Sequence, residues 1–378
     1  MSEPKLSAAA AALNAALDKS IGENEEVQGV KLWINTGDPQ LNYCISGMYD
    51  GGMPVGRIVE MYGPPSSGKT AEATDLMVRV QQMGGVAIFI DWERSFDVKL
   101  AKNMGLKTER PFWIYKTPET WEEGNALAIR AIDLIRASGI IPEEAPILVV
   151  LDSIASAVPQ SVLYDAKGNK REMTSFNMND TSALSRVTST TLKVVAQTAE
   201  QNNATFLYLN QQRTKIGVMF GDPTTTPGGS APEFYASVRI ALGRTKLMET
   251  VGGKKQFVGQ DIAAKVVKTK HTKPFQETSM RMMFDDNGVA YFDRHHNLIE
   301  FLKAKGVLKT AGSYIEWTDG KKYFPKALTE KLKGEADGLK QLQALIPSES
   351  PDVSTVEVNP SLDAKAELEK LMGDDDGE

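Results

Sequence analysis

The sequence predicts an α/β fold with a mostly parallel central sheet, an N-terminal helix and a small α+β C-terminal domain. Four short, nearly continuous apolar runs lie between residues 57 and 210, and the stretches that separate them are long enough for helices. Such runs are typical of parallel strands in a sheet that helices cover on both faces. Apolar residues alternate between Val238 and Lys270 and flank glycine-containing turns, which predicts added strands that continue the sheet. The four runs are 58–62, 86–90, 147–151 and 205–209.

The composition divides the chain into four regions. An alanine-rich stretch at 6–19 predicts a helix, because alanine costs least to place in one. Residues 347–378 contain ten acidic residues and two lysines, with several prolines and serines, which is the composition of a disordered tail. The regions that we expect are 1–50 for the helix and a linker, 51–285 for the core, 286–346 for the small domain and 347–378 for the tail.

Charge, hydropathy and cysteine content exclude several classes of protein. The chain of 378 residues carries a net charge of −6, but the tail alone carries −8, so the first 346 residues carry +2. The folded part can therefore present a basic surface to a nucleic-acid partner. The apolar runs are too short to cross a bilayer, so we expect no membrane partner. Cys44 is the only cysteine and lies far from the histidines, which argues against a zinc site and suits a reducing cytoplasm.

A phosphate-binding loop follows the first apolar run. Residues 63–70, GPPSSGKT, satisfy G-x-x-x-x-G-K-[ST] between a predicted strand and a predicted helix. We expect backbone N–H groups and the helix N-terminus to bind the phosphates of ATP, Lys69 to reach the β- and γ-phosphates, and Thr70 to hold Mg²⁺. The residues predicted to bind the nucleotide here are Gly63, Pro64, Pro65, Ser66, Ser67, Gly68, Lys69, Thr70 and Ala71.

Two carboxylates follow other strands at the same edge of the sheet. Asp152 closes the third run, where it would hold Mg²⁺ through water, although an aspartate in this position can also be a helix cap. Glu93 follows the second run, where it would orient or deprotonate the attacking water, although it can equally be an exposed loop acid. The residues alone leave both alternatives open.

Longer stretches of the chain resemble the RecA family of recombinases. They include GRIVEMYGPPSSGKT at 56–70, LDSIASAVP at 151–159 and NQQRTKIGVMFGDP at 210–223. FYASVR at 234–239 and KVVKTK at 265–270 complete the set in the expected order, and the resemblance covers about 40–325. It implies a RecA-like P-loop ATPase core.

The resemblance implies roles for further residues. Glu93 is similar to the family's catalytic glutamate, and Gln211 is similar to the glutamine that senses the γ-phosphate. Lys268 and Lys270 are similar to a lysine pair that reaches the ATP of the neighbouring subunit, where positive charge stabilises the transition state. Asp97 matches a residue near the adenine. Two positions depart from the family: Leu100 replaces a common stacking tyrosine, and Ala71 replaces a second threonine.

Two loops are predicted to bind single-stranded DNA. The first, about 160–180, is longer than usual in the family, and its basic residues Lys167, Lys170 and Arg171 predict DNA contact by charge alone. The second, 212–229, combines cations with apolar residues that would wedge between bases. Arg186, Ser189 and Lys193 lie at helical spacing and resemble residues that contact the DNA backbone. The residues predicted in the second loop are Arg213, Lys215, Ile216, Gly217, Val218, Met219, Phe220, Gly228 and Gly229.

The resemblance implies a DNA-dependent ATPase that forms a helical filament on single-stranded DNA and pairs it with a homologous duplex. Single-strand-binding and mediator proteins are possible partners, and the N-terminal helix resembles the family's polymerisation element. Two alternatives stay open: a ring-forming helicase with the same core, and a recombination regulator that uses ATP as a structural ligand. The acidic tail would either keep the protein in solution or compete with DNA for its basic surface.

Overall fold

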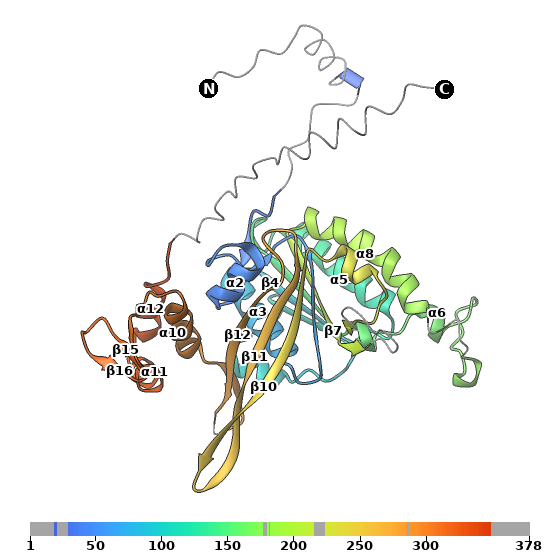
Figure 1. The fold of residues 1–378 in the computed structure, drawn as a ribbon. Coiled ribbons are helices and arrows are strands. Elements are labelled where there is room, and N and C mark those ends of the chain that lie inside the picture. Colours follow the sequence, from blue (N-terminus) through green and yellow to red (C-terminus); the bar gives the residue numbers. More distant parts are fainter. Residues whose placement is uncertain are drawn as a thin grey trace, which may run out of the picture. The chain divides into compact units, whose positions relative to one another are not determined.

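The computed structural model describes residues 19–20, 29–176, 180, 182–214, 224–285 and 287–348 (Figure 1). The chain forms two compact units, Met1–Leu32 and Trp33–Glu378. In the first unit, the helix expected at 6–19 lies outside the described residues except for Lys19, which is helical. The tail beyond Ser348 and residues 215–223 of the second loop also lie outside them.

A nine-stranded sheet forms the centre of the second unit. Six neighbouring strands, from β10 to β5 in the order below, are parallel to one another, and the other three extend the sheet in antiparallel pairs. This arrangement confirms the predicted mostly parallel sheet. The order is β13 (Ala290–Phe292), β12 (Gln276–Phe284), β11 (Lys254–Thr269), β10 (Val238–Val251), β3 (Ile58–Gly63), β7 (Ala204–Gln211), β6 (Ile147–Asp152), β4 (Val86–Asp91) and β5 (Trp113–Lys116).

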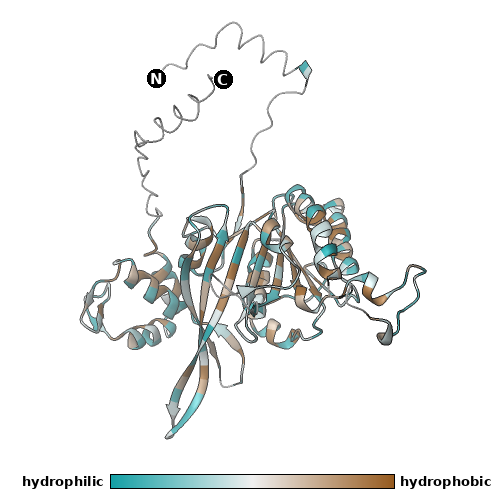
Figure 2. Ribbon diagram, turned by 45° about the vertical axis from the view of Figure 1, so that its right-hand side comes forward, coloured by the Kyte–Doolittle hydropathy of each residue, from teal (hydrophilic) through white to brown (hydrophobic). Residues whose placement is uncertain are grey.

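Strands β3, β7, β6 and β4 correspond to the four apolar runs of the sequence. Every residue of β3, β4 and β6 is buried, because helices cover both faces of the sheet. In Figure 2 the central strands carry much of the brown colour that marks hydrophobic residues. The sheet continues past residue 285 to Phe292.

Three long helices cover the sheet. Helices α5 (Trp121–Ser138) and α8 (Ala183–Gln201) share one apolar core with alternate residues of β4, β6 and β7. Helix α3 (Lys69–Gln82) contacts β3, β4, β6 and β7 with side chains that are not part of that core, so it lies on the other face. On this face, α3 begins beside the carboxyl end of β3.

Residues 293–346 surround a second apolar core. Helix α10 (Arg294–Ala304) contributes Leu298, Phe301 and Leu302, and Tyr49 from the beginning of the unit packs against Phe301 with ring centroids 5.1 Å apart. A small antiparallel sheet and two further helices complete it: β14 (Thr310–Ala311), β15 (Tyr314–Glu316), β16 (Lys322–Tyr323), α11 (Pro325–Lys333) and α12 (Gly338–Gln343).

Short elements connect these layers. A two-stranded sheet of β8 (Arg213–Thr214) and β9 (Thr224–Thr225) closes the base of the second loop. The others are β1 (Trp33–Ile34), α2 (Pro39–Ser46), β2 (Met53–Pro54), α4 (Val98–Asn103), α6 (Gln160–Leu163), α9 (Ala231–Tyr235) and the 3₁₀ turns Ile154–Ser156 and Met173–Ser175. Among the described residues, no helix has both the length and the apolar character that crossing a bilayer requires.

Candidate nucleotide-binding and catalytic site

The phosphate-binding loop connects β3 to α3, in the strand–loop–helix context that the motif requires. Gly63 lies so close to β10 that a Cβ atom there would stand 2.4 Å from the carbonyl oxygen of Leu242. Gly68 has φ 94°, a conformation that side chains with Cβ rarely adopt, and it precedes the first residue of the helix. The sequence requirement for glycine at both positions therefore has a steric cause.

The first turn of α3 is suited to bind an anion. Gly68 provides no side-chain cap, so the N–H groups of the first turn remain available to a ligand. Lys69 Nζ donates to the carbonyl oxygens of Gly63 at 3.2 Å and Pro64 at 3.0 Å, which places its charge on the loop. Burial lowers the pKa of Lys69, while the nearby charges of Asp152 and Glu93 oppose that shift. A phosphate would stabilise the charged lysine in this position.

Thr70 and Asp152 meet at the carboxyl end of the sheet. The hydroxyl of Thr70 donates to Oδ2 of Asp152 at 3.1 Å. Burial, and then the charge of Glu93, raise the pKa of the Asp152 carboxyl to about 7. A cation between these oxygens would favour the ionised carboxylate, and a hydroxyl with a carboxylate suits the oxygen preference of Mg²⁺. The donor set therefore fits the expected metal.

Glu93 contacts residues from two other strand ends. Its Oε1 accepts hydrogen bonds from Ser153 Oγ at 2.5 Å and Ser156 Oγ at 3.2 Å, and Gln211 Nε2 lies within 3.4 Å of it. The structure thus brings Glu93 and Gln211 together. The two serines were not among the predicted residues.

Asp91 holds the turn that carries Glu93. Its carboxylate accepts hydrogen bonds from the backbone N–H groups of Arg94 at 2.6 Å and Phe96 at 3.2 Å, and from the hydroxyl of Tyr115 at 2.8 Å. Burial and the Asp91 contact raise the pKa of Tyr115 to about 12, so it remains a donor. Three bonds to one buried carboxylate fix the chain direction after β4.

The other predicted nucleotide residues belong to the loop, to the start of α3 and to the segment after β4. Asp97 caps α4 by accepting from the N–H of Leu100 at 3.0 Å, so both belong to one short helix after β4. Pro65 and Ser66 are exposed and Ala71 is half-buried. Gln260 of β11, which the sequence did not suggest, donates to the carbonyl oxygen of Ser66 at 3.4 Å and supports the loop from behind.

Lys268 and Lys270 lie away from the phosphate-binding loop of their own chain. In the register of the sheet, Lys268 lies opposite Arg239, and Arg239 lies opposite Glu60 in the middle of β3, whereas the loop follows the end of β3. Lys268 Nζ donates to the carbonyl oxygens of Glu233, at 2.5 Å, and Phe234, at 3.0 Å. This placement is compatible with action on a neighbouring subunit.

The predicted DNA-contacting residues occupy different environments. Arg186, Ser189 and Lys193 are all exposed on α8, on one face of that helix. Lys167, Lys170 and Arg213 are exposed, and Gly228 and Gly229 both have positive φ, at 96° and 74°. Six residues of the second loop lie outside the described part of the chain: Lys215, Ile216, Gly217, Val218, Met219 and Phe220.

Arg171 is already engaged within the first loop. Its guanidinium donates to both carboxylate oxygens of Asp180, at 2.9 and 3.0 Å, and to the carbonyl oxygens of Ser161 and Ser175. It also lies 5.4 Å from the ring centroid of Phe176. Arg171 therefore braces the loop, while Lys167 and Lys170 present its charge.

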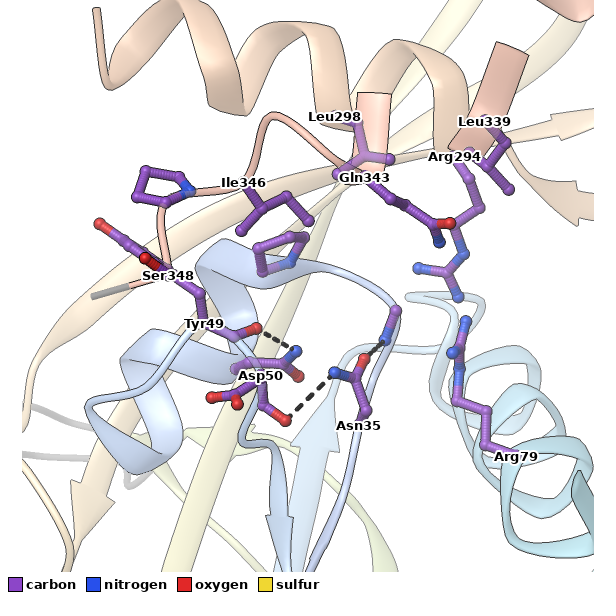
Figure 3. A pocket seen from close by; sticks show the side chains of 14 residues that line it. Asn35, Tyr49, Asp50, Arg79, Arg294, Leu298, Leu339, Gln343, Ile346 and Ser348 are labelled. Atoms are coloured by element: carbon purple, nitrogen blue, oxygen red, sulfur yellow. Dashed lines mark hydrogen bonds between the residues drawn. The ribbon is translucent and has the colours of Figure 1, made fainter. Parts of the chain in front are cut away.

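A cavity of about 490 Å³ lies elsewhere, between residues 35–50, α3, α10 and α12. Figure 3 shows the guanidinium groups of Arg79 and Arg294 close together at its edge. Both donate to the same oxygen of Asp75, at 2.6 and 2.7 Å. None of the residues of the phosphate-binding loop lines this cavity, and neither does Glu93.

A parallel sheet with a G-x-x-x-x-G-K-T loop at the end of β3, and carboxylates at the ends of β4 and β6, defines a P-loop ATPase. The sequence model of the RecA N-terminal domain matches residues 16–290. The chain therefore belongs to the RecA family.

Individual members show the same relationship. The chain is 35% identical over 272 residues to the chromosomal RecA protein of Lactococcus lactis, a match that covers 72% of this chain and 64% of that protein. It is 33% identical over 313 residues to RecA of Leptospira meyeri, covering 80% and 74%. With RecA of Bifidobacterium breve it shares 32% over 322 residues, covering 83% and 74%.

Proposed function

We propose that this protein is a DNA-dependent ATPase that forms a filament on single-stranded DNA and catalyses homologous pairing and strand exchange in recombination and DNA repair. The observation that carries the proposal is the contact of Glu93 with Gln211 at 3.4 Å. Gln211 ends β7 and leads directly to β8 at the base of the second loop. One short segment thus joins the nucleotide site to a predicted DNA-binding loop.

In this proposal, Lys69 and the N-terminus of α3 bind the phosphates of ATP, and Thr70 and Asp152 hold Mg²⁺, which neutralises phosphate charge. Glu93 orients the attacking water, restrained by Ser153 and Ser156. Gln211 reports the presence of the γ-phosphate to the second loop. Asp97 and Leu100 would lie beside the adenine.

DNA contact in the proposal combines charge with apolar residues. The exposed cations Lys167, Lys170, Arg186, Lys193 and Arg213 would meet phosphates, and the apolar residues of the second loop would separate bases without reading sequence. Lys268 and Lys270 would act on the ATP of the adjacent subunit, so that ATP stabilises the filament. We also propose that the protein acts in the cytoplasm and that it contacts single-strand-binding and mediator proteins.

The test measures ATP hydrolysis with and without single-stranded DNA, together with strand exchange between a circular single strand and a homologous linear duplex. We expect DNA-stimulated hydrolysis and joint molecules from the wild type, and a loss of hydrolysis of at least about a hundredfold in Glu93→Gln, since a general base contributes at least that much. Stimulated hydrolysis with duplex unwinding but no homologous pairing would instead indicate a helicase. ATP binding without stimulated turnover would indicate a regulator.

A further inference from the structure

Glu60 is a buried carboxylate in the middle of β3. Its side chain is 1% exposed, between apolar neighbours that are also buried. Oε2 accepts from Arg239 Nε at 2.6 Å, and Oε1 accepts from Asn210 Nδ2 at 2.9 Å. The acid therefore joins β3 to β10 on one side and to β7 on the other.

The hydrogen bond between Glu60 and Asn210 connects Glu60 to the chain's own nucleotide site. Asn210 Nδ2 also donates to the carbonyl oxygen of Pro227 at 3.0 Å, and Asn210 Oδ1 accepts from the N–H of Gln211 at 2.9 Å. Asn210 thus holds the end of β7, from which Gln211 reaches Glu93, and the far end of the second loop. A shift of Glu60 would move both.

The Arg239 side leads to Lys268. Arg239 Nη1 lies 3.3 Å from Oε1 of Glu233, and its guanidinium stacks over Tyr62 with 5.1 Å to the ring centroid. Burial is the largest single influence on the pKa of Arg239 and lowers it, but the charge and hydrogen bond of Glu60, together with the charges of Tyr62 and Glu233, leave this pKa above its usual range. Glu233 is the residue whose carbonyl oxygen accepts from Lys268. The position of Lys268 therefore depends on the segment that Arg239 holds.

Stability alone is a weak reason for such an arrangement. Apolar residues of similar volume often replace a buried ion pair without loss of stability, because desolvation cancels most of the attraction. Removing one partner lowers the stability strongly, because it leaves the other charge buried without a partner. The pair therefore constrains the relative positions of the residues that it joins. A buried pair with hydrogen bonds on both sides fixes the relative positions of three strands.

We propose that Glu60 is a positioning residue that links Gln211, at the chain's own ATP, to Lys268, at the ATP of the neighbouring subunit. The inference rests on the proposed function, which assigns Lys268 to the neighbour. Each subunit in a filament then connects two successive ATP sites. Binding of ATP at one interface favours binding at the next, which gives cooperative dependence on ATP concentration.

The experiment measures DNA-stimulated hydrolysis by the full chain over a range of ATP concentrations. For the wild type we expect a Hill coefficient clearly above one. Glu60→Gln keeps the shape of the side chain and the acceptor for Asn210 but removes the charge that holds Arg239. We expect its Hill coefficient to fall to about one and its half-saturating ATP concentration to rise severalfold, with a smaller change in kcat than in half-saturation.

Glu233→Gln provides a second variant, because Glu233 is 68% exposed and its replacement leaves the core intact. We expect it to lower the Hill coefficient as well. Glu200→Gln is the matched control, since the side chain of Glu200 is 54% exposed and lies 3.2 Å from Arg57, and the ATP dependence of this variant should equal that of the wild type.

The outcomes separate the two proposals. A wild type without DNA-stimulated hydrolysis would defeat the proposed function. A wild type that is stimulated by DNA, with Hill coefficients unchanged in the folded variants at Glu60 and Glu233, would defeat the positioning role alone. A Hill coefficient of one in the stimulated wild type would also overturn it.

Discussion

Ser153 and Glu93, which follow different strands, form a short hydrogen bond in the candidate site, with 2.5 Å between Oγ and Oε1. Ser156 donates to the same oxygen at 3.2 Å. Both hydroxyls donate to the same carboxylate oxygen of Glu93, so they set its position and would compete with a water molecule for that oxygen.

The two serines should therefore have opposite effects on hydrolysis. Ser153→Ala removes the shorter bond and should lower kcat about tenfold, because a hydrogen bond to a charged group is worth about 1.5–3 kcal/mol. Ser156→Ala leaves that bond and removes one of the donors that compete with water for Oε1, so kcat should rise by about twofold to fivefold. Steady-state kinetics with saturating single-stranded DNA measures both. A large fall in the kcat of Ser156→Ala would show that both hydroxyls position Glu93.

Asp75 should be important for stability. Its Oδ2 accepts from Arg79 and from Arg294, whose side chains are 24% and 14% exposed. In Asp75→Ala these guanidiniums lose their shared partner, and we expect the free energy of unfolding to fall by about 3 kcal/mol. Denaturant titration measures it. Glu300→Ala is the control, since the Lys303–Glu300 pair is more exposed and should be worth at most about 1 kcal/mol. Equal losses of the free energy of unfolding in Asp75→Ala and Glu300→Ala would contradict the stabilising role assigned to Asp75.

His271 should make stability depend on acid pH. Burial, and then the charges of Arg57 and Lys270, lower its pKa to about 4, and its ring meets Trp33 edge-on at 5.1 Å. Because the unfolded chain takes up this proton near pH 6.5 and the folded chain only near pH 4, stability falls as the pH decreases through that window. His271→Phe keeps the aromatic contact, and its Tm should decrease less than that of the wild type between pH 6.5 and 4. Parallel Tm curves would exclude this role.

The acidic tail offers a test that is independent of the folded core. Residues 347–378 carry a net charge of −8, and a segment of that charge would compete with DNA phosphates for the same cations. A chain that ends at Ile346 should bind duplex DNA more tightly, with the difference largest at low salt. Fluorescence anisotropy with a labelled duplex measures the affinity. Unchanged affinity would leave the tail a solubilising role.

The sequence predicted the buried strands well and the partly exposed ones poorly. Strands β3, β4 and β6 are recognisable because every residue is buried. Strand β5 lies at the edge of the sheet and buries only Trp113 fully, so it lacks a continuous apolar run. Strand β13 has three residues, too few for an alternating pattern, and the sheet therefore extended further than predicted.

The same contrast applies to the site. Backbone geometry forces glycine at Gly63 and Gly68, so a local motif reveals the phosphate-binding loop. The contacts of Ser153, Ser156 and Gln260 depend on which strands lie side by side, and serine and glutamine occur throughout the chain. The bidentate pair of Arg171 with Asp180 likewise has no local signal, which explains why charge alone suggested DNA contact for Arg171.

The distinction between Arg171 and its neighbours can be tested by salt dependence. Lys193 is exposed on α8, and the side chain of Lys170 is 67% exposed with a weak contact to Glu119 at 3.9 Å. If each meets one phosphate, Lys193→Gln and Lys170→Gln should each reduce the slope of log K against log salt by about 0.7 for single-stranded DNA. Arg171→Gln breaks the brace instead, so affinity should fall with a smaller change in slope, and the loop should become more susceptible to proteolysis. Filter binding between 50 and 200 mM salt, roughly the range over which such contacts weaken, measures the slopes. A full slope change in Arg171→Gln without increased proteolysis would mean that Arg171 leaves Asp180 to bind DNA directly.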